Sequence, residues 1–168
     1  VENRKWTKHP CGPGSTDTYT KRMQSELLPF LKKHDIKSML DLPCGNYSWM
    51  SKTGVANEIE YIGADIVESM INTCKDQYRN VDFRILDLTT DELPDVDLLF
   101  CRDCLLHLSF ADIDKAFANI ARSNIKYILL SNWNDGRNTV DIKTGQHRFL
   151  NFNKAPYNFV EGIDSIDD

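Results

Sequence analysis

Long hydrophobic runs are missing from this chain of 168 residues. No apolar stretch approaches the roughly 20 residues that a membrane-spanning helix needs, and the N-terminal residues lack the hydrophobic region of a signal peptide. We therefore expect a cytoplasmic protein without a membrane span. Hydrophobic residues make up 41% of the chain and charged residues 27%, which is typical of a globular protein and of one domain at this length.

The sequence also lacks the regular cysteine spacing of a disulfide framework. Its five cysteines are an odd number, which favours a reducing compartment. Cys101 and Cys104 form a single C-x-x-C, and a zinc site would need a second ligand pair, which neither His107 nor the other cysteines supply at a familiar spacing. We interpret Cys101 and Cys104 as two thiols packed at the end of a strand, in preference to a redox pair, and we expect no metal.

Glycine-rich phosphate-binding motifs are absent as well. The sequence contains neither G-x-G-x-x-G nor a P-loop, so it supports no cradle for a pyrophosphate or a triphosphate. The net charge is −5, but residues 1–37 hold 8 Lys and Arg against 4 Asp and Glu, whereas the rest holds 12 against 21. This distribution argues against a broad nucleic-acid surface and leaves open a local basic patch near the first helix.

What the sequence does contain is a regular alternation of strand and helix patterns. Apolar residues at a spacing of four, with Ser15 or Thr16 as N-cap, predict a first helix, and three more helical segments follow between five short apolar runs. This order predicts βαβ units and hence an α/β fold, with a mostly parallel central sheet and helices on both faces. The apolar stripe of the first helix is Tyr19, Met23, Leu27 and Leu31. The expected strands are residues 36–42, 59–66, 81–88, 96–102 and 126–133. The later helices are expected at 47–54, closed by Gly54; at the segment marked by Val67, Met70, Ile71, Cys74 and Tyr78; and at 110–124, with Ile113, Phe117 and Ile120 facing inward.

Charged residues stand where four successive strands are expected to end. They are Asp41, Asp65, Asp87 and the pair Arg102–Asp103. In an open α/β sheet, ligands bind outside the carboxyl ends of the strands. One such carboxylate can simply cap the next helix, but the full set indicates a ligand rich in hydroxyls and amines.

The stretch DLPCG at Asp41–Gly45 gives this ligand a more definite shape. Gly45 allows close approach to the backbone at the first strand-to-helix turn, and Pro43 restricts the form of that turn. Asp65 follows Asp41 by 24 residues, about where a carboxylate that binds ribose hydroxyls belongs, and Asp87 can accept a hydrogen bond from an adenine amine. A turn with one glycine favours an adenosine ligand without phosphate, such as S-adenosylmethionine, over NAD.

The motifs DLPCG with WM, YIGADI and CRDCLLHLS resemble those of class I S-adenosylmethionine-dependent methyltransferases. They are most similar to small glycan-modifying members from bacterial polysaccharide pathways and large DNA viruses of algae. The resemblance runs from Gly12 to Asn151 and implies a Rossmann-like sheet, S-adenosylmethionine as cofactor and S-adenosylhomocysteine as product. If the protein is viral, the resemblance implies that it acts in the host cytoplasm. The similar proteins include domains of larger glycan-modifying proteins, so this chain could be part of such a protein.

The resemblance also implies a division of the chain. Residues 1–37 would form a lid and helix, 38–133 the cofactor-binding core, and 134–168 a polar acceptor-side segment of one methyltransferase domain. Two departures from the family stand out: the glycine signature is reduced to Gly45, and the sequence ends in GIDSIDD, where the fold normally adds a final hairpin. The implied cofactor contacts are Asp41, Pro43, Cys44, Gly45 and Asn46 for the methionine end, Asp65 and Ile66 for the ribose, and Asp87 and Leu88 for the adenine, with Arg102 at the fourth strand end.

Asp103 and His107 are the candidate catalytic residues. They are four residues apart at the expected start of a helix after the fourth strand, so we expect them to share one helix face. Transfer to a hydroxyl requires a base, and one residue would take the proton while the other orients it or binds the acceptor. The alternative is a helix-capping aspartate and a histidine satisfied in the core.

The expected function is O-methylation of a sugar or glycan hydroxyl. The alternatives are a small-molecule or protein methyltransferase, or a cofactor-binding subunit without catalysis. Aromatic rings can stack on sugars, and amide or guanidinium groups can bind hydroxyls; each could equally serve packing. The candidates for the acceptor wall are Trp6, Asn132, Trp133 and Arg148, and Ser15 lies in a possible lid, residues 6–16.

Overall fold

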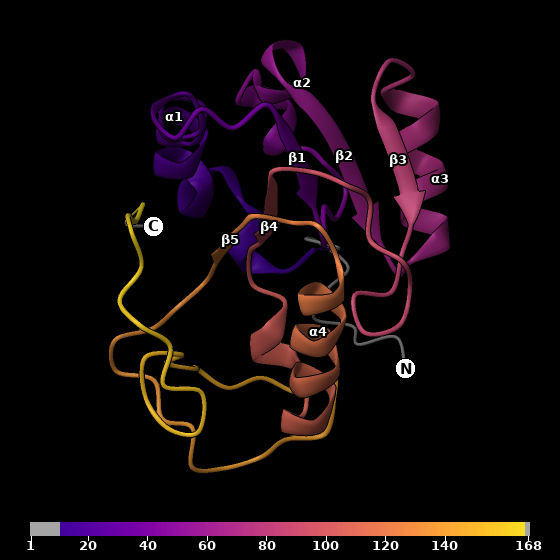
Figure 1. Ribbon diagram of the computed structural model, residues 1–168. Helices are drawn as coiled ribbons and strands as arrows, with labels where there is room; N and C mark the ends of the chain where they lie inside the picture. The colour runs from indigo at the N-terminus through magenta and orange to yellow at the C-terminus, as the bar shows by residue number, and fades with distance from the viewer. Residues whose placement is uncertain (1–10, 167–168) are drawn as a thin grey trace.

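A five-stranded parallel sheet forms the centre of the computed structural model, which describes residues 11–166 (Figure 1). The strand order is β3-β2-β1-β4-β5, so the chain begins in the middle of the sheet and proceeds to one edge and then to the other. All four strand pairs are parallel, which confirms the predicted fold class. The strands are β1 Ser38–Asp41, β2 Glu60–Asp65, β3 Asp82–Ile85, β4 Leu98–Cys101 and β5 Tyr127–Leu130.

Helices cover both faces of the sheet because each has one apolar stripe to bury. The helices α1 and α3 pack on one face through Leu27 and Ile71, against Met39 and Phe100 of the sheet. Helix α4 packs on the other face through Ile113 (Figure 1). The helices are α1 Asp17–Lys33, α2 Val55–Glu58, α3 Glu68–Gln77 and α4 Phe110–Arg122, with short 3-10 turns η2 Pro13–Ser15, η3 Met50–Lys52 and η4 Leu105–His107.

Three local predictions were wrong. Tyr19 is 63% exposed, and the neighbouring Thr20 takes its place in the buried stripe of α1. The expected helix 47–54 is instead the single turn η3, and Gly54, at φ 74°, precedes α2 as its N-cap instead of closing a helix. The strands are also shorter than the apolar runs that predicted them, because the runs continue beyond the strand ends into loops.

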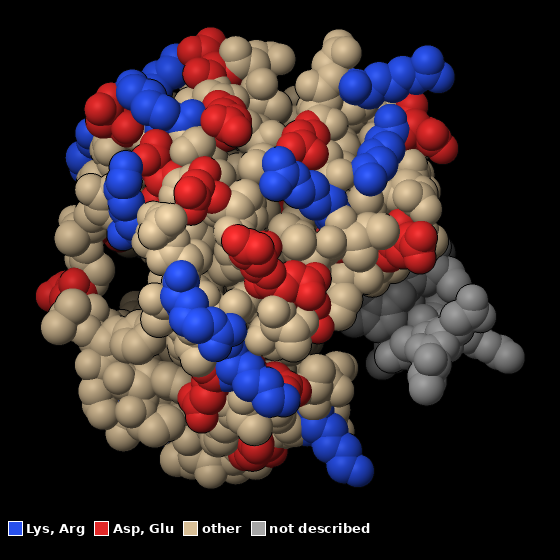
Figure 2. Space-filling view, turned by 45° about the vertical axis from the view of Figure 1, so that its right-hand side comes forward, with Lys and Arg blue, Asp and Glu red and all other residues tan. Residues whose placement is uncertain are grey.

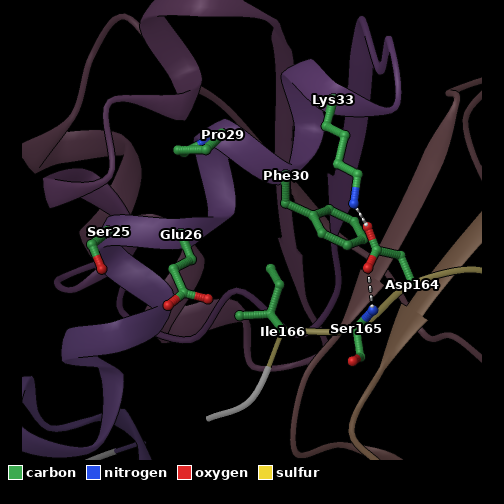
Figure 3. Close-up of a pocket in the computed structure, with 8 residues that line it drawn as sticks. All are labelled: Ser25, Glu26, Pro29, Phe30, Lys33, Asp164, Ser165 and Ile166. Carbon is green, nitrogen blue, oxygen red and sulfur yellow. Dashed lines mark hydrogen bonds and ion pairs between the residues drawn. The ribbon is translucent and has the colours of Figure 1, made fainter.

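The segment 131–166 has neither helix nor strand, and side-chain amides hold much of its backbone. Asn138 Nδ2 donates to the carbonyls of Asn151 at 2.7 Å and Ala155 at 2.9 Å. The segment then returns to α1, where Asp164 accepts from Lys33 Nζ at 2.7 Å and contacts His34 Nε2 at 2.7 Å. Figure 3 shows the contact between Lys33 and Asp164, which both line a pocket. The volume of this pocket is about 270 Å³.

Within the described part of the chain, no helix is long and apolar enough to cross a membrane. On the face presented in Figure 2, Lys and Arg alternate with Asp and Glu instead of forming one basic area. That face therefore offers no broad patch for nucleic acid, in line with the uneven but mixed charge of the sequence.

Candidate active site

The turn after β1 is a close-packed backbone cradle. Gly45 has φ +55°, and a side-chain carbon there would lie 2.8 Å from Cys11 Sγ, so only glycine fits without displacement. Cys11 Sγ also accepts a hydrogen bond from the Asn46 amide at 3.2 Å. Cys44 is buried, and its amide donates to the Ala64 carbonyl at 2.7 Å, which ties the turn to β2. Pro43 precedes Cys44 in the same turn. The predicted methionine-end residues thus lie together at the carboxyl end of β1.

Asp65 joins this turn to the end of β2. Its Oδ2 accepts from the Gly45 amide at 3.2 Å and its Oδ1 from the Val67 amide at 2.9 Å. Burial raises the pKa of the Asp65 carboxyl, while these backbone hydrogen bonds oppose the rise. The Asp65 carboxylate therefore lies beside Gly45. A ligand that extends from the end of β1 to the end of β2 could contact both residues.

Asp41 lies deeper than a ligand contact would need. It is 2% exposed, and its Oδ2 accepts the Tyr61 hydroxyl at 2.6 Å. Burial raises its pKa to about 8, although the hydrogen bond from Tyr61 favours the charged form. In this structure the side chain is bonded to Tyr61 of β2 inside the protein.

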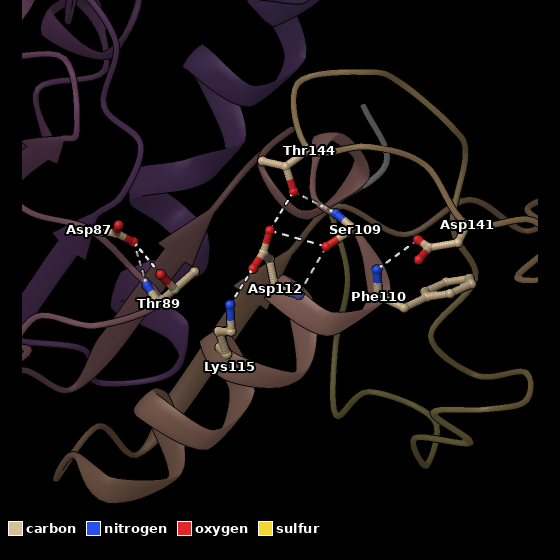
Figure 4. Close-up of polar contacts among 8 residues, drawn as sticks. All are labelled: Asp87, Thr89, Ser109, Phe110, Asp112, Lys115, Asp141 and Thr144. Atoms are coloured by element: carbon tan, nitrogen blue, oxygen red, sulfur yellow. Dashed lines mark hydrogen bonds and ion pairs between the residues drawn. The ribbon is translucent and has the colours of Figure 1, made fainter.

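The end of β3 places an aspartate beside apolar side chains. Asp87 Oδ1 accepts from the amide and hydroxyl of Thr89 at 2.8 and 2.7 Å (Figure 4). Leu88 is buried in the core, so its backbone is the part nearest a ligand, whereas Ile66 is 62% exposed after β2. An exposed large apolar side chain directly after the Asp65 carboxylate is a suitable wall for a flat ring.

A second cluster forms at the end of β4. Asp103, at φ +55°, accepts the Ser131 hydroxyl at 3.1 Å through Oδ1 and contacts Arg102 Nη1 at 3.1 Å through Oδ2. Arg102 Nη1 also donates to the Gly14 carbonyl at 3.0 Å, and its guanidinium lies 5.8 Å from the ring centre of Trp49. The segment around Gly14 therefore lies against Asp103, with the described end of the predicted lid over two strand ends.

Asp103 and His107 do not share a helix face, and that structural expectation was wrong. Asp103 has left-handed backbone geometry before η4, and α4 begins only at Phe110. His107 Nδ1 lies 2.8 Å from the Gln146 carbonyl. Because a carbonyl only accepts, Nδ1 carries the proton in the neutral ring, and the lone pair is on Nε2. This tautomer can act as a base through Nε2.

The acceptor-wall candidates separate in the structure, and Trp6 lies outside the described residues. Asn132 uses its side chain internally, since Oδ1 accepts from the Phe152 amide at 2.7 Å and Nδ2 donates to Asn153 at 3.0 Å. Ser15 donates to the Gly12 carbonyl at 2.7 Å within its own turn. These two side chains are therefore engaged in holding loops.

Trp133 belongs to a chain of rings that we call the aromatic strip. Its ring centre lies 5.3 Å from that of Phe149, which lies 4.9 Å from His147, which in turn lies 5.6 Å from His107. His147 is exposed and Phe149 is 53% exposed. The strip thus leads over the surface from the end of β5 to the candidate base.

Arg148 faces away from this strip. Its guanidinium carbon lies 4.4 Å from the ring centre of Phe110, the first residue of α4. Its side chain is 9% exposed, and the nearest carboxylate oxygen, Oδ1 of Asp141, is 3.9 Å from Nη1. The guanidinium therefore points to Phe110 and Asp141, and not to the residues of the aromatic strip.

All five cysteines are free thiols. Cys101 is buried at the end of β4, and a hydrogen bond with the Cys104 thiol together with burial raises its pKa. Between residues 11 and 166, no three His, Cys, Asp or Glu side chains are grouped to hold a metal ion. The absence of a metal requirement stays a prediction.

Several contact residues were not predicted from the sequence. Ser131 follows β5 directly, so the strand-end argument that selected the aspartates could have found it. Gly14 and Tyr61 gave no signal, because their contacts with Asp103 and Asp41 join distant parts of the chain. His147 could not be linked to His107 before the fold was known, since the contact that brings them together joins His107 to Gln146, 39 positions further along the chain.

Comparison with known proteins agrees with this geometry. Residues 39–124 match the family model described as a methyltransferase domain, which is about half of the chain, so the chain belongs to this methyltransferase family. The family and the site at the strand ends together imply S-adenosylmethionine as the cofactor. A search of curated protein sequences finds no match.

Solved structures show the same fold at low sequence identity. The PH0226 protein of Pyrococcus horikoshii has a TM-score of 0.60 at 19% identity, covering 79% of this chain and 68% of its own. The methyltransferase domain of bacterial CtHen1 has 0.58 at 14%, covering 66% and 65%. An S-adenosylmethionine-dependent methyltransferase of Clostridium acetobutylicum has 0.55 at 14%, covering 77% and 52%. The chain thus spans about half to two thirds of the length of these structures.

The residues at the strand ends fit this cofactor. The Gly45 turn leaves no room for a side chain and permits close approach of a ligand to the backbone. Asp65 lies beside it as a hydrogen-bond acceptor, and Ile66 offers an exposed apolar surface next to it. The ribose of an adenosine would therefore meet the Asp65 carboxylate as hydrogen-bond acceptor, and its adenine ring would meet the apolar side chain of Ile66.

Proposed function

We propose that this protein transfers a methyl group from S-adenosylmethionine to a hydroxyl of a sugar or glycan. The observation that carries the proposal is the aromatic strip, which ends at His107 and has exposed rings at Phe149 and His147. Exposed aromatic faces suit the apolar faces of sugar rings, and a base at the end of the strip suits a hydroxyl acceptor. The proposal includes a cytoplasmic enzyme that needs no metal ion.

In the proposed mechanism, Gly45 and its turn receive the methionine end, Asp65 accepts from the ribose hydroxyls, and Asp87 accepts from the adenine amine. Bound S-adenosylmethionine supplies a methyl carbon already activated by its sulfonium. The protein then has to orient the acceptor hydroxyl in line with that carbon, a contribution of positioning.

His107 is the proposed base. Its Nε2 takes the proton from the acceptor hydroxyl as the oxygen attacks, while the Gln146 carbonyl keeps Nδ1 protonated and supports the imidazolium that forms. Asp103, held by Ser131 and Arg102, is the proposed acceptor-orienting carboxylate. This assigns the two residues different tasks, as their separate positions require.

The test offers the protein a panel of acceptors: neutral and acidic oligosaccharides, peptides and small phenols. Methyl transfer to each acceptor is measured as the formation of S-adenosylhomocysteine. Transfer to oligosaccharides supports the proposal. Transfer to peptides or phenols alone would move the protein to the alternative class, and cofactor binding without any transfer would favour a partner subunit. Activity lost in EDTA and restored by magnesium or manganese would contradict the metal-free mechanism.

Two variants examine the base. We expect His107→Ala to lower turnover by about 10²–10⁴-fold with little change in cofactor affinity, because a general base contributes that much. Asp103→Asn keeps the shape and removes the charge, so a large loss would assign a role to the carboxylate itself. Near-normal turnover in both would place the base elsewhere.

The strip has its own test. Phe149→Ala should raise the KM for the oligosaccharide and leave the affinity for S-adenosylhomocysteine unchanged. Tyr19→Ala is the matched control, since Tyr19 is an exposed aromatic on α1, away from the strip. Equal KM values in both variants would remove the support that the strip gives to a sugar acceptor.

A further inference from the structure

Arg148 is a buried charge without a hydrogen-bond partner. Its Nε, Nη1 and Nη2 atoms are all sealed from solvent and form no hydrogen bond within residues 11–166. The contact with Asp141, at 3.9 Å, is too long for a hydrogen bond. Guanidinium stays protonated in proteins, and a buried charge is costly unless it is paired. Such an arrangement calls for a partner that is not a described residue.

Asp141 does not supply the missing hydrogen bonds, because its nearest oxygen, Oδ1, lies 3.9 Å from Nη1 and already accepts two backbone amides. Its Oδ1 accepts the Phe110 amide at 2.8 Å (Figure 4). The same oxygen accepts the Ile142 amide, also at 2.8 Å. It approaches Arg148 only from the Nη1 side. The Nε and Nη2 atoms form the other edge of the guanidinium, and two parallel N–H groups on one edge match the two oxygens of a carboxylate.

A second buried donor lies at the same place. The Tyr157 hydroxyl is sealed from solvent and has no partner among the described residues. Its ring packs edge-on against Phe110 at 6.3 Å, and Phe110 is also the ring beneath the Arg148 guanidinium. Burial raises the pKa of Tyr157 to about 12, and the positive charge of Arg148 opposes the rise. The hydroxyl thus keeps its proton and can donate.

The position of this pair relates it to the proposed acceptor site. The Arg148 amide donates to the Leu106 carbonyl at 3.2 Å, and the Gly145 amide donates to that of His107 at 2.8 Å, so segment 145–148 runs beside η4. The His147 and Phe149 rings lie on the strip, whereas Arg148 points to the other side, toward Phe110. A chemical group of the acceptor that binds to Arg148 would therefore belong to a different sugar unit from the one that stacks on the aromatic strip.

We propose that the Nε/Nη2 edge of Arg148 and the Tyr157 hydroxyl form a carboxylate-binding subsite, which takes a uronic acid unit next to the sugar that is methylated. The inference rests on the proposed function, since it assigns the carboxylate to the acceptor. Because these nitrogens are sealed from solvent in the structure, the proposal requires a local opening of the surrounding loop segment, which has no helix or strand. Pairing in a desolvated site makes the two hydrogen bonds strong.

The experiment uses two disaccharides that differ only in whether the second unit is glucuronate or glucose, with inorganic phosphate as a third probe. Calorimetry measures binding to the wild-type chain, to Arg148→Met and to Tyr157→Phe. We expect the glucuronate disaccharide to bind about tenfold or more tightly than the neutral one, and Arg148→Met to abolish the difference. Arg137→Met, an exposed arginine of the same segment, should keep it.

Thermal unfolding without ligand provides a separate measurement. Because the substitution removes a buried charge whose nitrogens have no hydrogen-bond partner among the described residues, Arg148→Met should unfold at the same or a higher temperature than the wild type. A clear fall would show that Arg148 is a structural contact of Phe110 and would overturn the proposal. Tyr157→Phe keeps the ring and should weaken glucuronate binding by a smaller factor.

The remaining outcomes separate this subsite from the proposed function. Equal binding of both disaccharides in all variants, with sugar methylation retained, overturns the subsite alone. Arg148-dependent glucuronate binding without methylation of any sugar supports the carboxylate subsite and overturns the sugar methyltransferase. If phosphate binding depends on Arg148 and the glucuronate disaccharide is not preferred, the site binds a free anion instead of an acceptor carboxylate. This result would overturn the uronic acid subsite.

Discussion

Asp65 connects two strand ends through a single carboxylate. Its oxygens accept the amides of Gly45 and Val67, so the residue fixes the first turn and the entry to α3 at once. Carboxylate oxygens have further lone pairs, which leaves capacity for the hydroxyls of a ligand. The side chain is therefore placed to support the cradle and to take part in it.

Asp65→Ala should severely weaken binding of S-adenosylhomocysteine. Each charge-assisted hydrogen bond contributes about 1.5–3 kcal/mol, and two ribose hydroxyls would lose their acceptor. Calorimetry on the folded variant measures the loss, and Asp82→Ala, which removes an exposed carboxylate from β3, is the control. Unchanged affinity would leave Asp65 only as a brace for the turn.

Asp41 should make stability depend on pH. Burial raises its folded-state pKa from 3.8 to about 8. Between these values the folded state binds more protons than the unfolded chain, so the free energy of unfolding falls as pH rises. The fall amounts to as much as about 4 kcal/mol from pH 4 to pH 7.

Asp41→Asn should flatten this slope, because the amide does not titrate. Urea unfolding from pH 5 to pH 8, without cofactor, compares the two chains. Tyr61→Phe removes the hydrogen bond that favours the charged carboxylate, so it should extend the fall in stability to higher pH. Parallel profiles for the wild type and Asp41→Asn would mean that Asp41 is ionised in the folded protein.

At the scale of the elements, α4 begins in a network that ties it to the acceptor-side segment. Ser109 Oγ accepts the Asp112 amide at 3.2 Å as the N-cap. Thr144 Oγ1 donates to Asp112 Oδ2 at 2.6 Å and accepts from the Ser109 amide at 2.9 Å (Figure 4). The first turn of α4 and the loop at residues 141–144 therefore hold each other.

Ser109→Ala should lower the free energy of unfolding by about 1 kcal/mol, the usual cost of losing an N-cap. Denaturant unfolding measures it, and Ser69→Ala, an exposed serine in the first turn of α3 that is not its N-cap, should change little. An equal effect of both substitutions would show that the cap bond contributes nothing beyond side-chain replacement.

The elements that the sequence predicted are those fixed by local periodicity. Apolar runs and the stripes of α1, α3 and α4 were sufficient for the parallel sheet and its covered faces. The strand-end rule placed Gly45 and Asp65 together. It failed for the geometry of Asp103 and His107, because the left-handed residue and the turn η4 depend on contacts with Ser131 and Gln146, far along the chain.

At the scale of the molecule, an ordered sheet carries a long segment without regular structure. Residues 131–166 satisfy much of their backbone through asparagine side chains instead of a ladder. Tertiary hydrogen bonds of this kind open more easily than a buried sheet. We infer that segment 131–166, which we propose as the acceptor side of the site, is less stable than the sheet.

Asn138→Ala should therefore speed hydrogen exchange at residues 150–158 and lower the free energy of unfolding by about 1 kcal/mol, because the partly buried Asn151 carbonyl and the exposed Ala155 carbonyl lose their donor. Exchange in β1 and β4 should change less. Asn134→Ala is the matched control, as Asn134 is exposed and its backbone carbonyl makes the bonds. Uniform acceleration across the sheet would mean that the segment unfolds with the whole molecule.

Cys11 gives the molecule a native chemical reporter. Its sulfur lies directly on Gly45, and the thiol is only partly buried, although burial raises its pKa and slows its alkylation. A ligand in the first turn would shield that sulfur, whereas an acceptor on the aromatic strip would not. The rate of Cys11 labelling, followed by mass spectrometry with and without S-adenosylhomocysteine, should thus measure cofactor occupancy without any engineered probe.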